Sequence, residues 1–326
     1  MKLPHRRQFL HLAAGAATLP AFPYIARAQA YPTRPARILV GFPAGGAADT
    51  IVRIMALWLP DRLGQSFVVE NRSGAATNLA LQAALSSPPD GYSLVYIATS
   101  TAISTTLYES QSFNFLRDSS AVAGLVRFPH IMAAHPSLPA KTVAELIALA
   151  RSSPDKVNVA SYGTGTTSHL AGELFESLAG IDFVHVPYRG DAQAMPDLLS
   201  GRVQIYIATL TTTLPYIQSG ALRALAVTGK TRFDKLPDVP TVDEFVPGYE
   251  VDPVAGLGVR KGTPPEIIEK LNSEINAGLA NSTIKARLAE LATVPLPMSA
   301  TEFASYMAAE TNKWAKVIRA ANIKPE

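Results

Sequence analysis

Short apolar runs alternate with amphipathic segments along most of the chain. Runs typical of buried strands lie at residues 38–40, 67–69, 93–98, 121–134, 157–160, 183–186, 203–207 and 222–227. Apolar residues at helical spacing lie at 47–63, 79–85, 142–150, 170–178, in a segment ending at 199, and at 264–279, 282–291 and 301–321. Strands that alternate with helices predict a right-handed, mostly parallel α/β sheet, in which ligands bind beyond the carboxyl ends of the strands.

This alternation occurs on both sides of two strand-like connections, at 121–134 and 249–259. A chain of 326 residues is also long enough for about two domains. We therefore predict that residues 31–128 and 250–326 form one domain and that residues 129–249 form the other.

Three local expectations follow from the same pattern. The helices after residue 263 should pack on the first domain. Thr263 and Glu266 have the spacing of a capping box for the first of these helices. Residues 99–102 and 208–213 should form loops at the carboxyl ends of strands.

A glycine pair follows the first predicted strand, in the sequence Gly41-Phe42-Pro43-Ala44-Gly45-Gly46, and a helix follows the pair. Backbone N–H groups of such a loop and of the first helical turn point the same way, so they can hold an anion. Glycine suits this position because it adopts positive φ and lets a ligand approach the main chain. An ordinary turn between strand and helix is the alternative. A second loop of this kind, from Ser161 to His169, strengthens the anion-site interpretation.

Charge and composition exclude several classes of protein. The 29 basic and 26 acidic residues include four basic residues and no acidic one within positions 1–30, so the rest of the chain is nearly neutral. It holds no basic block of the kind that binds nucleic acid, so nucleic acid is not an expected partner. The absence of cysteine excludes disulfides and thiolate chemistry.

Residues 1–30 have the features of a cleavable export signal: a basic start, a weakly apolar segment and small residues near position 30. The sequence His5-Arg6-Arg7-Gln8-Phe9-Leu10 is similar to the twin-arginine export pattern, and Sec export is the alternative. No apolar run of about 18 residues follows, so no membrane-spanning helix is expected. The sequence therefore predicts a periplasmic protein.

Several further motifs are distinctive in combination. They are Pro43-Ala44-Gly45-Gly46 with Asp49 and Arg53, Val69-Glu70-Asn71-Arg72 with Gly74, Pro89-Asp90-Gly91-Tyr92, Gly163-Thr164-Gly165-Thr166 with His169 and Leu170, His185-Val186-Pro187-Tyr188 with Gly190, 222–228, and 236–241. Together they resemble the periplasmic solute receptors of tripartite tricarboxylate transporters, often called the Bug family. The resemblance covers nearly all of the chain after residue 30.

This resemblance implies a two-domain, hinged fold of the periplasmic-binding-protein type (the Venus flytrap), in which each domain is a mostly parallel sheet flanked by helices. It also implies a small mono- or dicarboxylate ligand, membrane subunits of a tripartite transporter as partners, and no enzymatic activity. The sequence departs from the family pattern in five places. They are the segment 74–78, which usually reads Gly-Ala-Gly-Gly-Asn, Arg189 where lysine is common, Asp191 and Met195 where uncharged small residues or proline are common, and Val254-Ala255-Gly256 where an aromatic pair often precedes the glycine.

The candidate site combines the two glycine-rich loops, the hydroxyl-rich loops and the motif residues. Asp49 and Glu70 would repel an anion and are interpreted as structural, with Arg53 one helical turn from Asp49 as its partner. The candidate ligand-binding residues are Phe42, Pro43, Ala44, Gly45, Gly46, Asn78, Thr99, Ser100, Thr101, Tyr162, Gly163, Thr164, Gly165, Thr166, Thr167, His169, Tyr188, Arg189, Gly190 and Thr209.

A secreted hydrolase that uses His169 as a base in the same cleft is the alternative function. No G-x-S-x-G motif accompanies this histidine, so catalysis is not expected. The histidines at 130, 135, 169 and 185 lack the spacing of metal ligands, and neither a metal nor a cofactor is expected. We expect the protein to act as a monomer that binds a small carboxylate.

Overall fold

The computed structural model describes residues 31–108, 113–153, 156–320 and 322–324. The predicted export signal lies outside these residues. The strands are β1 (Ala36–Val40), β2 (Phe67–Asn71), β3 (Ser93–Ala98), β4 (Ser119–Arg127), β5 (His130–Ala134), β6 (Asn158–Ser161), β7 (Val184–Pro187), β8 (Ile205–Thr209), β9 (Arg223–Val227), β10 (Val254–Arg260) and β11 (Val294–Pro295). The helices are α2 (Ala47–Leu63), α3 (Asn78–Leu85), α4 (Thr99–Leu107), α5 (Phe115–Asp118), α6 (Val143–Ser152), α7 (Thr167–Ala179), α8 (Asp191–Leu199), α9 (Leu210–Gln218), α10 (Pro265–Ala280), α11 (Ser282–Glu290) and α12 (Ala300–Ala320), with short 3₁₀ turns η1 (Ala75–Thr77) and η3 (Val242–Glu244).

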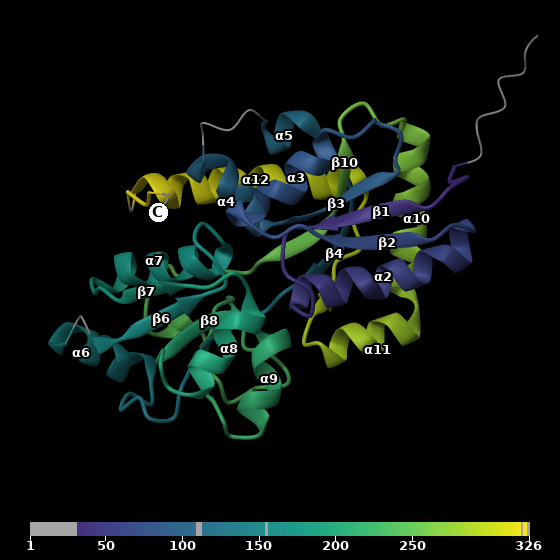
Figure 1. Ribbon diagram of the computed structural model, residues 1–326. Coiled ribbons are helices and arrows are strands. Elements are labelled where there is room, and N and C mark those ends of the chain that lie inside the picture. The colour runs from purple at the N-terminus through teal and green to yellow at the C-terminus, as the bar shows by residue number, and fades with distance from the viewer. Residues whose placement is uncertain (1–30, 109–112, 154–155, 321, 325–326) are drawn as a thin grey trace, which may run out of the picture. The chain divides into compact units, whose positions relative to one another are not determined.

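Among the described residues the strands form two sheets (Figure 1). The first has the order β11-β4-β10-β3-β1-β2, and the second has the order β7-β6-β8-β5-β9. In the first sheet β1 to β4 run in one direction and β10 and β11 run against them. In the second sheet only β5 opposes the others. The predicted α/β fold with two sheets flanked by helices is therefore confirmed. Both sheets are mixed rather than mostly parallel, because five of the nine strand pairings among the described residues are antiparallel.

The opposed strands follow from the path of the chain. Strand β4 belongs to the first sheet and β5 to the second, so residues 128–129 carry the chain from one sheet to the other. The chain returns between β9 and β10, and β10 then lies between β3 and β4, antiparallel to both. The single strand predicted at 121–134 is thus two strands in different sheets.

Two predicted loops are the starts of helices. Residues 99–102 form the first turn of α4, and α9 begins at Leu210, directly after β8. Hydroxyl-bearing residues favour such starts because their side chains hydrogen-bond to nearby backbone groups. The capping box expected at Thr263 is also wrong, because Pro264 caps α10 and the Thr263 hydroxyl donates to the Arg260 carbonyl (2.8 Å).

The last helix packs on elements of both sheets. Its buried Trp314 and Ile318 belong to the same hydrophobic cluster as Phe175 of α7 and Tyr249, which precedes β10. The Tyr249 hydroxyl donates to the Ala171 carbonyl of α7 (3.1 Å), which holds this cluster together. Helix α12 also contacts α4 and β4. Helices α10 and α12 therefore pack on elements of the first sheet as expected, and the end of α12 also packs near α7.

The segment after β2 has an unusual backbone. Ala75, Ala76 and Thr77 all have positive φ, at 46°, 49° and 79°. A residue with a Cβ in this region is strained, at a cost of about 1–2 kcal/mol each. The segment that departs from the family pattern, 74–78, thus holds three residues with a Cβ in a strained backbone conformation.

None of the described helices has the length and apolar character needed to cross a membrane.

Candidate ligand-binding site

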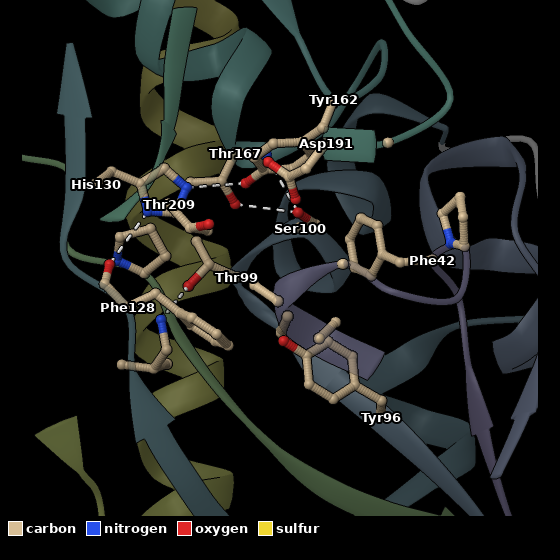
Figure 2. A pocket seen from close by; sticks show the side chains of 18 of the residues that line it. Phe42, Tyr96, Thr99, Ser100, Phe128, His130, Tyr162, Thr167, Asp191 and Thr209 are labelled. Atoms are coloured by element: carbon tan, nitrogen blue, oxygen red, sulfur yellow. Dashed lines mark hydrogen bonds between the residues drawn. The ribbon is translucent and has the colours of Figure 1, made fainter. Parts of the chain in front are cut away.

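One pocket is lined by loops that follow strands of both sheets (Figure 2). Five helices begin at its wall: α2 after Gly46, α4 after Ala98, α7 at Thr167, α8 after Gly190 and α9 after Thr209. The first N–H groups of each helix lack a partner within the helix, and the helix dipole places partial positive charge there. Five such ends around one pocket create a positive environment without a cationic side chain.

The side chains that line the pocket carry little charge. None of the described residues that line the pocket is lysine or arginine, and Asp191 is the single acidic one. Among the described residues, no cluster of three or more histidine, aspartate or glutamate side chains could hold a metal ion. An anionic group in this pocket would therefore be held by backbone N–H groups and hydroxyls.

The first glycine loop is fixed by Asp49. Its Oδ2 accepts hydrogen bonds from the Gly45 N–H and from Arg53 Nε, both at 2.9 Å, and its Oδ1 accepts from Asn71 Nδ2 at 2.9 Å. Burial acts to raise the pKa of Asp49, but the hydrogen bonds from Arg53, Gly45 and Asn71 outweigh it and lower that pKa. The predicted pairing of Asp49 with Arg53 is confirmed.

We expect Asp49→Asn to reduce the free energy of unfolding at pH 7 by about 1–3 kcal/mol, because charge-assisted hydrogen bonds to Gly45 and Arg53 are weakened. A lowered pKa in the folded state means that the carboxylate stabilises the fold above its unfolded pKa and loses this effect as the pH falls through the folded value. Urea unfolding at pH 7 and below pH 3 measures the difference in unfolding free energy between the variant and the wild type, which should be smaller at the lower pH. An equal difference between variant and wild type at both pH values would contradict it.

A direct contact joins the two sheets at the pocket. Ser100 Oγ of α4 lies 3.1 Å from Thr167 Oγ1 of α7 and accepts the Thr167 N–H at 3.2 Å (Figure 2). The Phe42 and Tyr162 rings meet edge to face, 5.9 Å apart. The loops that follow β1 and β3 therefore touch those that follow β6, as in a closed cleft.

Tyr162 is held by a neutral histidine. The His130 Nδ1–H donates to the Phe128 carbonyl (3.1 Å), so its Nε2 accepts from the Tyr162 hydroxyl (3.0 Å). Burial lowers the pKa of His130 to about 4 and raises the pKa of Tyr162. His130 is thus an uncharged acceptor near neutral pH, and it adds no positive charge to the pocket.

Asp191 is the first residue of α8, and its side chain is fixed by two hydroxyls. Its Oδ1 accepts from the Tyr206 hydroxyl (2.7 Å) and from Thr212 Oγ1 (3.3 Å). A Cβ placed on Gly46 would lie 3.8 Å from its Oδ2. Burial raises the pKa of Asp191, and the hydrogen bonds from Tyr206 and Thr212 act against this. The carboxyl group therefore lies next to the start of α2, at the wall of the pocket.

A second pocket adjoins the first, because Phe42 and Tyr162 line both. Arg189 is exposed at this second pocket, and the Tyr188 hydroxyl donates to Asp197 Oδ2 (2.7 Å). The candidate residues found at this pocket are Phe42, Tyr162, Gly163, Thr164, Thr166, Tyr188 and Arg189. Those found at the first pocket are Phe42, Pro43, Gly46, Thr99, Ser100, Tyr162, Thr167, Gly190 and Thr209.

Six candidate residues line neither pocket: Ala44, Gly45, Asn78, Thr101, Gly165 and His169. Polar groups of Gly45, Asn78, Thr101, Gly165 and His169 form hydrogen bonds within the protein. Thr101 Oγ1 accepts from the Ala98 N–H (3.2 Å), which stabilises the start of α4. Asn78 Oδ1 accepts from Ser104 Oγ (3.1 Å), while its buried Nδ2 has no hydrogen-bond partner among the described residues.

His169 supports the second glycine loop. Its Nδ1 accepts the Gly165 N–H (3.1 Å), its Nε2 lies 3.3 Å from Glu173 Oε1, and its ring stacks on His185 at 4.1 Å. With Nδ1 already bonded to the backbone, this buried ring is not positioned as a base toward the pocket. The hydrolase alternative is not supported.

Sequence reasoning missed several residues of the first pocket. They are Ala47, Ala48, Tyr96, Ala98, Phe128, His130, Asp191, Ala192, Pro253 and Val254. Phe128 and His130 lie at the first crossing between the sheets, and Pro253 and Val254 lie at the second. The sequence predicts the two connections between the sheets, at 121–134 and 249–259, but does not indicate that residues of these connections line the pocket.

Comparison with known proteins agrees with these observations. The family described as "Tripartite tricarboxylate transporter family receptor" matches residues 51–323. Protein BugT of Bordetella pertussis is 33% identical over 300 residues, which cover 91% of this chain and 92% of BugT. The Rhodopseudomonas palustris protein Rpa4515, solved with adipate, has 34% identity and a TM-score of 0.87 over 91% of this chain and all of that one. MatC of the same organism, solved with malate, has 28% identity and a TM-score of 0.84 over 88% of this chain and all of that one.

Proposed function

Because the chain belongs to the receptor family of tripartite tricarboxylate transporters, we propose that it binds a small mono- or dicarboxylate in the pocket and delivers it to the membrane subunits of such a transporter. Solute-binding receptors of this family are not enzymes, and no catalytic role is assigned to any residue here. The export-signal features of residues 1–30 support a periplasmic location, reached by the twin-arginine or the Sec route.

The convergence of five helix N-termini on one pocket carries this proposal. Backbone N–H groups at helix starts bind anions without a buried cation, and a carboxylate oxygen can accept several of them. The adipate complex of Rpa4515 and the malate complex of MatC, both close in fold, add support for a small carboxylate as the ligand.

We further propose that the ligand lies between two hinged domains, formed by residues 31–128 with 250–326 and by residues 129–249. The Ser100–Thr167 contact supports closure of these parts on each other. In this proposal the candidate residues of the first pocket contact the ligand, those of the second pocket lie at its mouth, and the six remaining candidates shape the loops. In this proposal the protein is a monomer, and each monomer binds one ligand.

A thermal-shift screen with mono- and dicarboxylates tests the proposal. A ligand at 100 times its Kd stabilises the folded state by about 2.7 kcal/mol, which raises the melting temperature measurably. We expect at least one small carboxylate to bind with a stoichiometry of one by calorimetry and to be recovered unchanged. Chemical conversion of the bound compound, or a screen in which no carboxylate shifts the transition, would contradict the proposal.

A further inference from the structure

The pocket contains one acidic side chain in a place suited to anions. Asp191 is the first residue of α8, so its own carboxyl group lies at the positive end of that helix. Among the described lining residues no lysine or arginine balances it. A second carboxylate bound directly against Asp191 would be repelled, because like charges at close range in a poorly solvated pocket interact strongly.

The two oxygens of the Asp191 carboxyl group have different surroundings at the pocket wall. Tyr206 and Thr212 hold Oδ1 through their hydroxyl groups. Oδ2 lies 3.8 Å from the position that a Cβ on Gly46 would take. The carboxyl group is therefore positioned in advance next to the start of α2, and a ligand group that reaches this part of the pocket wall would meet Oδ2.

Burial without a counter-charge makes an ionised carboxylate costly, which is why the pKa of Asp191 is raised. A ligand that carries an ammonium group would remove this cost by donating a charge-assisted hydrogen bond. The starts of α2, α4 and α9 would offer backbone N–H groups to a ligand carboxylate, whereas the Thr167 N–H of α7 already donates to Ser100 Oγ. The pocket thus offers complementary positions for both charges of a zwitterion.

We infer that Asp191 is a specificity-determining residue that selects amino carboxylates, whose ammonium group donates to Asp191 Oδ2 while their carboxylate binds the N–H groups at neighbouring helix starts. This inference rests on the proposed function and narrows its ligand class. Plain carboxylates of the same length would bind more weakly, because they leave the half-buried Asp191 charge unbalanced.

Calorimetry at pH 7 on the full-length mature protein tests this inference with matched pairs: succinate against aspartate, glutarate against glutamate, and butyrate against 4-aminobutyrate. We expect the amino compound of at least one pair to bind on the order of 10-fold more tightly than its partner. Asp191→Asn should remove that preference by weakening the amino compound. The plain carboxylate should bind the variant at least as well as the wild type.

Asp197→Asn is the matched control. Asp197 lies on the same helix and also accepts a tyrosine hydroxyl at 2.7 Å, but it lines neither pocket. This variant should keep the wild-type preference. If circular dichroism shows that Asp191→Asn misfolds, Asp191→Ser takes its place. The comparison of amino and plain carboxylates on the wild-type protein requires no variant.

Two outcomes overturn the inference while leaving the proposed function intact: the wild type binds plain carboxylates as tightly as their amino partners, or Asp191→Asn keeps the preference. If no compound of either series binds, the proposed function fails and the inference fails with it.

Discussion

Gly46→Val is expected to weaken binding of any carboxylate that stabilises the wild type by about 10- to 100-fold, while the protein stays folded. Gly46 caps α2 with φ −81° and ψ 174°, an extended backbone that any residue adopts. A Cβ there would meet the Pro43 carbonyl at 3.6 Å and Asp191 Oδ2 at 3.8 Å, which are ordinary contact distances. The two methyl groups of valine extend beyond that Cβ into space that the ligand needs, and overfilling such a site costs about 1–3 kcal/mol.

Gly229→Val is the matched control for this experiment. No atom lies within 4 Å of a Cβ at Gly229, its φ is not positive, and it lines neither pocket, so it tolerates the same side chain outside the binding site. Calorimetry should give the control the wild-type affinity, and circular dichroism should show both variants folded. If Gly46→Val bound carboxylates as tightly as the control did, the start of α2 would not be part of the binding site.

Much of the fold could be predicted because hydrophobic periodicity and glycine-rich loops are local signals. The strand, loop and helix around Gly45 and Gly46 are present as expected, with Asp49 and Arg53 paired across one helical turn. The second glycine loop likewise precedes α7. Each of these features depends on residues close together in the sequence, so one stretch of sequence suffices to indicate it.

The parts that sequence reasoning missed depend on distant pairing. Asp191 reaches the pocket because its carboxyl group is oriented by Tyr206 of β8 and Thr212 of α9. His130 enters it because β5 runs antiparallel to β8 and β9 in the second sheet. The packing of Trp314 near Phe175 likewise joins residues far apart in the chain. No local pattern encodes these contacts, because they form only when the two sheets are assembled.

Gly190→Ala is expected to weaken ligand binding by about 5- to 100-fold through an effect on closure. Gly190 precedes α8, and a Cβ on it would lie 3.0 Å from the Pro43 ring, in the loop that follows β1. This contact joins loops of the two sheets. The added methyl group is therefore expected to clash with Pro43 only in the closed arrangement, in which these loops touch. Overpacking at such a contact costs about 1–3 kcal/mol of the closed state.

The positive φ of Gly190, 151°, adds backbone strain that a control must match. Gly220→Ala provides it, because Gly220 has φ 77° and no atom lies within 4 Å of its Cβ position. Both variants should lose stability in urea unfolding, since alanine is strained at either position, but only Gly190→Ala should lose affinity.

Solution scattering separates closure from simple loss of a contact. If the two proposed domains close on the ligand, the radius of gyration of the wild type and of Gly220→Ala should fall as carboxylate is added. Gly190→Ala should stay at the larger value at the same ligand concentration and contract only when more is added, because its closed state is less populated and its apparent affinity is reduced by that fraction. A wild type whose radius does not change at saturation would mean that the pocket is preformed, and the contact between Gly190 and Pro43 would then be a fixed part of the fold.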